Sequence, residues 1–198
     1  MKQIQTRLSV LQMCFVALCA VLNIAGANLA LLLRIPLYLD TLGTFLAALL
    51  LGPVWGMVPG LISGLLTGMT TDVYSFFYLP VQLVTGLMAG LLVHEKTFRS
   101  EKFRLLLYAL GITLPGTVVS ASITAFLFGG ITSSGSAVLV QVLHRLGLGL
   151  TASVFCVQLL TDYLDRAVML AAALAVLGVF PATLRAAITK GQKKHGQI

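Results

Sequence analysis

Long apolar runs, separated by short polar segments, dominate the sequence. An α-helix rises about 1.5 Å per residue, so about 20 apolar residues cross the hydrocarbon core of a bilayer. The run at 41–51 is shorter than this. It therefore needs the preceding loop to fold into the membrane, or it crosses a thin region lined by protein. The pattern predicts an all-α integral membrane protein, a single domain over residues 1–198 with six transmembrane helices at about 8–30, 41–51, 53–70, 74–93, 105–128 and 148–180.

Glycine recurs at every fourth position of the third run, at Gly52, Gly56, Gly60, Gly64 and Gly68. Residues four apart lie above one another on a helix, so this helix would carry a shallow groove without side chains. In water each glycine would cost about 1 kcal/mol relative to alanine, whereas helices in lipid associate through close approach at small residues. The groove either packs against neighbouring helices or slides against a partner.

The charge distribution also indicates a membrane protein. Of the 198 residues, 58% are hydrophobic and 10% are charged, and the mean hydropathy is +0.99. The net charge of +7 does not indicate nucleic-acid binding, because the basic residues gather in segments that can share one side of a membrane. By the positive-inside rule, both termini are expected in the cytoplasm. The clustered residues are Lys2, Arg7, Lys96, Arg99, Lys102, Arg104, Arg185, Lys190, Lys193 and Lys194.

Polar and charged residues interrupt the middle of the last run, at Gln158, Asp162, Asp165 and Arg166. A charge at the centre of a bilayer costs about 3 kcal/mol on insertion scales. Asp162 and Arg166 are four residues apart, so they share a helix face and can neutralise each other, and Asp165 can share the arginine. The cluster either holds neighbouring helices together or belongs to a ligand site. Charges inside membranes commonly mark ligand or ion paths, which favours the second alternative.

Further candidate residues lie near the outer ends of the predicted helices. Tyr38 and Asp40 belong to the loop before the second helix, and Tyr74 and Tyr78 begin the fourth. The tyrosines suit an interfacial aromatic belt and also the stacking of a ligand. Gln82 and Asn23 are amides in lipid, so each is expected to hydrogen-bond a partner. The hydroxyl groups along 105–128 would satisfy the backbone that Pro115 frees, and the Gly/Ser segment 129–136 would form a mobile outer loop.

Signatures of enzymes are missing from the sequence. There is no Gly-x-x-x-x-Gly-Lys-Ser/Thr phosphate loop, and no two histidines or cysteines have the spacing of metal ligands. Ser63 lies between glycines, as a buried nucleophile would, but no histidine lies in the same part of the chain. We therefore expect no catalytic residue, no metal site and no bound cofactor.

The second and third runs carry a more specific pattern. An acid precedes the second helix, and residues 47–60 read Ala-Ala-Leu-Leu-Leu-Gly-Pro-x-x-Gly-x-x-x-Gly. Together with an Ala-Leu-x-Ala segment in the first helix and the acid–base pair of the last, this pattern resembles the S components of energy-coupling factor (ECF) vitamin transporters. The resemblance covers nearly the whole chain.

The resemblance implies a substrate-binding subunit of an ABC-type importer in the bacterial plasma membrane. An ECF transmembrane T component and two cytoplasmic ATPases would be the partners, and the ATPases would use the ATP. Ala17, Ala20 and Val21 of the first helix would contact the T component. The substrate would be a water-soluble vitamin, with riboflavin, cobalamin and pyridoxine types left open. The implied substrate-binding residues are Tyr38, Asp40, Tyr74, Tyr78, Gln82, Gln158, Asp162, Asp165 and Arg166.

Two other classes of function fit the same helices. A membrane sensor or scaffold would bind a ligand without transporting it, and a stand-alone proton-coupled carrier would transport it without ATPases. No internal repeat is visible in the sequence, which counts against a carrier built from inverted halves.

Overall fold

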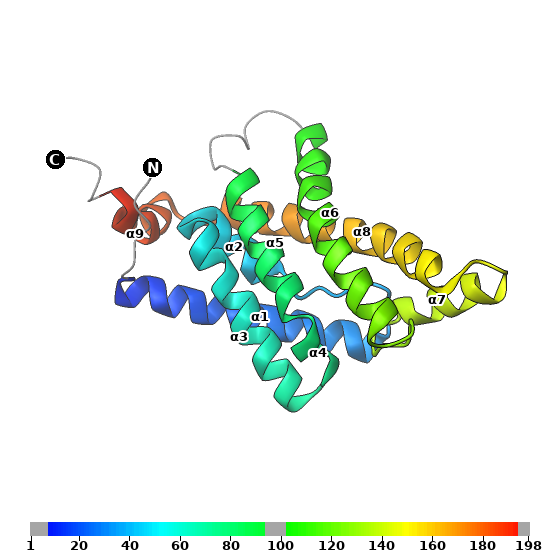
Figure 1. Ribbon diagram of the computed structural model, residues 1–198. Helices are drawn as coiled ribbons and strands as arrows, with labels where there is room; N and C mark the ends of the chain where they lie inside the picture. Colours follow the sequence, from blue (N-terminus) through cyan, green and yellow to red (C-terminus); the bar gives the residue numbers. More distant parts are fainter. Residues whose placement is uncertain (1–7, 94–101, 194–198) are drawn as a thin grey trace.

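The computed structural model describes residues 8–93 and 102–193, and every regular element in these two ranges is a helix (Figure 1). The all-helical prediction is therefore confirmed for the described part of the chain. The helices are α1 (Val10–Leu33), α2 (Leu42–Leu51), α3 (Pro53–Thr70), α4 (Tyr74–Phe77), α5 (Leu79–Leu92), α6 (Lys102–Phe126), α7 (Ser136–Arg145), α8 (Leu150–Val179) and α9 (Ala182–Lys193).

Two described helices are long and apolar enough to cross a membrane, Val10–Leu33 and Arg104–Phe126. A third crossing arises if Leu150–Val179 and Ala182–Thr189, which meet at 111°, count as one broken span. Shorter apolar helices lie at Leu42–Leu51 and Leu79–Leu92. These lengths and compositions fit a membrane protein, whereas six crossings stay a prediction.

Three helical segments differ from the pattern-based prediction. The helix expected at 74–93 is broken at Tyr78 into α4 and α5, and Pro80 occupies the first turn of α5, where a proline has no intrahelical hydrogen bond to lose. Residues 136–145 form α7, a separate helix near the outer ends of α6 and α8. Residues 182–193 form α9, where we expected only a basic tail.

Helix α9 packs against the start of α1 and against α2. The amide nitrogen of Gln12 donates to the backbone oxygen of Ile188 at 2.7 Å, and Ile188 is 1% exposed. The Ser9 side chain caps α1 by accepting from the backbone N–H of Gln12, and the Ser9 backbone N–H donates to the Gln12 side-chain oxygen. The Gln12 side chain therefore connects the start of α1 to α9.

Helix α2 occupies the centre of the bundle (Figure 1). Every residue from Gly43 to Leu51 is buried, and α2 contacts α1, α3, α5, α8 and α9. Because other helices enclose it, its outer surface meets protein and it need not be long enough to span lipid by itself. This explains how a run of 10 residues forms part of an apolar bundle.

Asn23 caps α2 from the neighbouring helix α1. Thr41 is the N-cap residue of α2, but its side chain makes no capping hydrogen bond. Instead the side-chain oxygen of Asn23 accepts from the backbone N–H of Gly43 at 2.7 Å and of Thr44 at 3.4 Å, and its nitrogen donates to the Thr44 hydroxyl at 2.9 Å. These contacts satisfy orphan N–H groups that the helix itself leaves open. The expected hydrogen bond of Asn23 to a second helix is confirmed.

The glycine face of α3 is a packing surface. Gly56, Gly60, Gly64 and Gly68 are all buried, and they face α2, α4 and α5. A Cβ atom on Gly56 would lie 2.6 Å from the Cβ of Ala48 in α2, and one on Gly86 of α5 would lie 2.7 Å from the backbone oxygen of Gly56. Of the two interpretations of the repeat, the structure bears out packing between helices.

Several basic residues that underlie the predicted orientation lie outside the described residues. These are Lys2, Arg7, Lys96, Arg99 and Lys194. The cytoplasmic location of both termini stays a prediction.

We expect Gly86→Ala to lower the free energy of unfolding by about 1–3 kcal/mol, because the added methyl group meets backbone atoms of α3 that cannot move aside. Gly178→Ala in α8 is the matched control, since a Cβ atom there meets nothing within 4 Å. Thermal unfolding in detergent measures both variants. Equal melting temperatures for the two would contradict the packing role of the glycine face.

Candidate ligand-binding site

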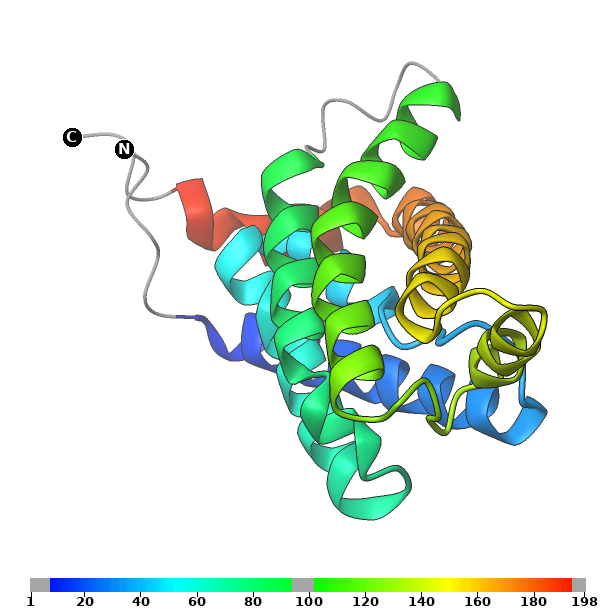
Figure 2. The same ribbon diagram turned by 45° about the vertical axis from the view of Figure 1, so that its right-hand side comes forward.

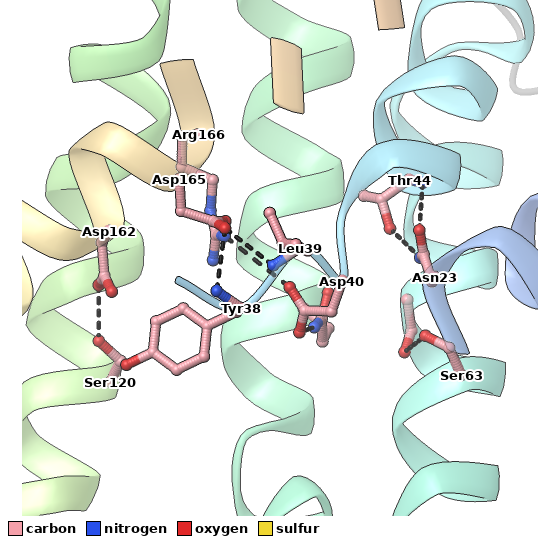
Figure 3. Close-up of polar contacts among 12 residues, drawn as sticks. Asn23, Tyr38, Leu39, Asp40, Thr44, Ser63, Ser120, Asp162, Asp165 and Arg166 are labelled. Carbon is pink, nitrogen blue, oxygen red and sulfur yellow. Dashed lines mark hydrogen bonds and ion pairs between the residues drawn. The ribbon is translucent and has the colours of Figure 1, made fainter. Parts of the chain in front are cut away.

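The connection between α1 and α2 is held against the middle of α8 by one carboxylate. Asp165 Oδ1 accepts from the backbone N–H of Tyr38 at 3.0 Å and from that of Leu39 at 2.9 Å (Figure 3). Leu39 adopts a left-handed backbone conformation with φ 54°, which is strained for a residue with a side chain. Its carbonyl group lies directly against Gly26 of α1, where a Cβ atom would collide with it. The connection is therefore fixed by tertiary contacts.

Arg166 binds the second oxygen of the same carboxylate. Its Nη1 atom lies 2.5 Å from Asp165 Oδ2 and 4.0 Å from Asp40 Oδ1. Arg166 and Asp165 are 5% and 0% exposed. The arginine thus compensates a buried charge and approaches the acid on the connection, which is what a buried ion pair requires.

The pair between Asp162 and Arg166 that the spacing predicts does not form. Asp162 Oδ2 instead accepts from the hydroxyl groups of Thr117, at 2.7 Å, and Ser120, at 3.0 Å, both on α6. The reason is local competition, since Asp165 and the acid of the α1–α2 connection both lie within reach of the guanidinium group. The expectation that Asp165 shares the arginine is confirmed.

A chain of hydrogen bonds continues from Asp162 toward α5. Gln158 Oε1 lies 3.2 Å from the Ser120 hydroxyl, and Gln158 Nε2 donates to the Thr124 hydroxyl at 2.6 Å. Thr124 in turn lies 2.5 Å from the Tyr78 hydroxyl. This network joins α8, α6 and the start of α5 at one depth of the bundle, and it fixes the direction of the Tyr78 side chain.

These elements line a cavity of about 90 Å³ that is partly open to solvent. Its wall combines the end of α1, the α1–α2 connection, the C-terminal half of α3, the α4–α5 region and polar residues of α6 and α8. Its mixture of apolar surface with a few convergent polar groups is typical of small-molecule sites. The predicted residues that line it are Tyr38, Asp40, Tyr74, Tyr78, Gln82, Asp162 and Arg166.

The Gly/Ser segment after α6 closes the cavity on one side. Ser133, Ser134 and Gly135 line the wall, and Gly135 lies directly against the backbone oxygen of Arg34. Figure 2 shows this segment and α7 beside the end of α1. The hydroxyl group of Ser136 lies 3.4 Å from that of Tyr38, which joins the segment to the α1–α2 connection.

Two predicted site residues do not line the cavity. Gln158 and Asp165 lie behind it and hold the residues that do. The sequence reasoning missed Ser63, Thr67, Asp72 and Ser120, which the cavity wall includes. A signal for part of this set was present, because Thr117, Ser120 and Thr124 follow a helical spacing of three and four and so share one face. The sequence alone predicts that these hydroxyl groups hydrogen-bond the backbone groups that Pro115 frees.

Several acceptor atoms of the cavity wall have no donor. Asp40 Oδ1 and Gln82 Oε1 are buried and accept no hydrogen bond from the described residues, although Gln82 Nε2 donates to the other oxygen of Asp40. Burial raises the pKa of Asp40 to about 6, against the lowering influence of the Arg166 charge.

The proposed partner-contact residues of α1 divide between two faces. Ala17 and Val21 are exposed, on the outer surface of α1. Ala20 is 2% exposed and belongs to the core, so it does not face a partner in this arrangement. The burial of Ala20 speaks against its expected contact with a partner, whereas contact through Ala17 and Val21 stays a prediction.

Comparison of the chain with models of protein families, with curated proteins and with solved structures found no match.

We expect Asp165→Asn to lower the free energy of unfolding by about 3 kcal/mol or more, since it leaves Arg166 without its nearest buried counter-charge. Asp72→Asn is the control, because Asp72 also lines the cavity but among the described residues its carboxylate accepts only the Ser75 hydroxyl. Thermal unfolding without added ligand measures both. A similar loss in the two variants would contradict the anchoring role of Asp165.

Proposed function

We propose that the chain is the substrate-binding S component of an ECF-type ABC importer in a bacterial plasma membrane. In this proposal it crosses the membrane six times, with both termini in the cytoplasm. It captures a water-soluble vitamin or related micronutrient from outside. The observation that carries the proposal is the solvent-open cavity, whose buried polar wall lies within an otherwise apolar helical bundle.

The position of the cavity supports capture from the outer side. On the predicted orientation, the α1–α2 connection and the Gly/Ser segment that line it are both outer loops. Helix α9 and the start of α1 lie toward the opposite end of the bundle in Figure 1. A ligand would therefore enter from outside between these loops, and a separate T component and two ATPases would supply the energy for its release inside.

Co-expression tests this proposal directly. The chain is expected to co-purify with an ECF T component and its ATPase pair, and the isolated chain is expected to bind a ligand without hydrolysing ATP. Proteoliposomes extend the test. Uptake by the chain alone would favour a proton-coupled carrier, and binding without uptake, even with the ECF module and ATP, would favour a sensor or scaffold.

The exposed face of α1 gives a mutational test of partner contact. Ala17→Trp is expected to reduce co-purification of the T component at least about tenfold while ligand affinity stays within about twofold, because small residues set the separation of helices in lipid. Leu159→Trp is the control, since Leu159 is also exposed but lies on α8. Loss of ligand binding with unchanged partner capture would show that the face of α1 is wrongly assigned.

A further inference from the structure

We infer that the ligand of this cavity is a small organic cation whose positively charged nitrogen is bound by Asp162. The inference rests on the proposed function and specifies the chemical class of its substrate. It follows from the charge balance of the cavity, from the partners of each acid, and from the acceptor atoms that the protein leaves unpaired.

Acidic residues gather around the cavity out of proportion to the basic ones. Among the described residues, all four acids lie there. Asp40, Asp72 and Asp162 line the wall, and Asp165 lies directly behind it. Arg166 is the single basic residue among the described lining residues. An anionic ligand would meet this excess of negative charge, whereas a cation would offset it.

The one arginine does not neutralise Asp162. Its ion pairs are with Asp165 and Asp40, whereas Asp162 receives only two hydroxyl groups, both on Oδ2. No described residue donates to Asp162 Oδ1, although the side chain is 3% exposed and lines the cavity. A buried carboxylate without a directly bound counter-charge is costly, so a cation at this oxygen would offset that cost.

Buried acceptor atoms without a hydrogen-bond donor also lie on the cavity wall opposite Asp162. Asp40 Oδ1 and Gln82 Oε1 are buried acceptors without a donor. Together with Asp162 Oδ1, these acceptor oxygens line the cavity from two sides and call for a ligand that brings N–H donors, although Arg166 lies 4.0 Å from Asp40 Oδ1. Figure 3 shows Asp162 and Asp40 on either side of the Tyr38 side chain, so we expect a ligand with donors at two ends to meet both acids.

The aromatic lining suits a flat, positively charged ring. Tyr38, Tyr74 and Tyr78 all contribute to the wall. Phe128 packs edge-on against Tyr74 with ring centroids 4.8 Å apart, and it also packs against Tyr78, so the two phenol rings are supported from behind. The faces of such rings attract cations.

A metal ion suits the same acids less well. No three His, Cys, Asp or Glu side chains of the described residues gather as ligands for one ion. The carboxylates are distributed along the cavity, which matches an extended organic molecule. The geometry therefore points to a protonated amine or a cationic heteroaromatic ring.

A panel of probes sorted by charge tests the inference on the purified wild-type chain in detergent. Thiamine and pyridoxamine are the cations, pyridoxine and riboflavin the neutral compounds, and pantothenate, biotin and nicotinate the anions. Thermal shift followed by calorimetric titration measures binding. We expect a cation to bind most tightly, and pyridoxamine to bind more tightly than pyridoxine, which differs by a hydroxyl in place of the amine.

Two variants then locate the charge. Asp162→Asn is expected to weaken binding of the best cation at least tenfold, about 1.4 kcal/mol. Ser122→Ala is the matched control, because Ser122 is half-buried on α6 outside the cavity wall, and among the described residues its hydroxyl donates only to the backbone oxygen of Val118. It should leave the affinity unchanged. Should Asp162→Asn fail to fold, the wild-type ranking of cation over neutral analogue decides the inference alone.

The outcomes separate this inference from the proposed function. Tightest binding of a neutral or anionic vitamin would overturn the cation preference and leave an S component intact. So would an Asp162→Asn variant that binds the cation with wild-type affinity. If no compound of the panel binds, the inference is overturned as well. Co-purification with the T component is measured separately and decides the proposed function.

Discussion

The carboxylate of Asp165 is the contact on which the site depends. It accepts two successive backbone N–H groups of the α1–α2 connection and neutralises Arg166 with its other oxygen. Through it, a non-helical segment is held against the middle of a 30-residue helix, where water would otherwise be needed to satisfy its backbone. Without this carboxylate the two backbone N–H groups of the connection would lose their hydrogen-bond acceptor inside the bundle. The part of the cavity wall that carries Tyr38 and Asp40 would then no longer be held in place.

Close packing of backbones supplies the frame around that contact. The glycines of α3 let it approach α2, and those of α5 let it approach α3, until backbone atoms come close, and the helix of 10 residues at α2 is buried along its length. The close packing of α3 and α5 places Gln82 of α5 beside Gly60 of α3. From there the Gln82 amide nitrogen donates to the Asp40 carboxylate. Small residues in the frame thus determine which polar groups meet at the cavity.

Much of the fold follows from the pattern of the sequence, and less of the site does. The helices at α1, α2, α3, α6 and α8 agree with the apolar runs, because length and hydropathy are local properties. Helices α7 and α9 were missed, since one is only semi-apolar and the other mixes short apolar side chains with basic and polar ones. The same limit explains the wrong partner for Arg166: helical spacing brought Asp162 within reach, but it could not reveal that a distant loop delivers Asp40 to the same guanidinium group.

The left-handed conformation of Leu39 has a consequence for how the molecule loses its structure. Helices hold themselves together by internal hydrogen bonds, but this segment keeps its shape only while the Asp165 carboxylate and the Gly26 surface remain in place. The relief of backbone strain on release favours local opening of the connection before the bundle melts. We therefore expect the part of the cavity wall that this segment forms to open before the helices melt, and a ligand that bridged the connection to α8 would oppose that opening.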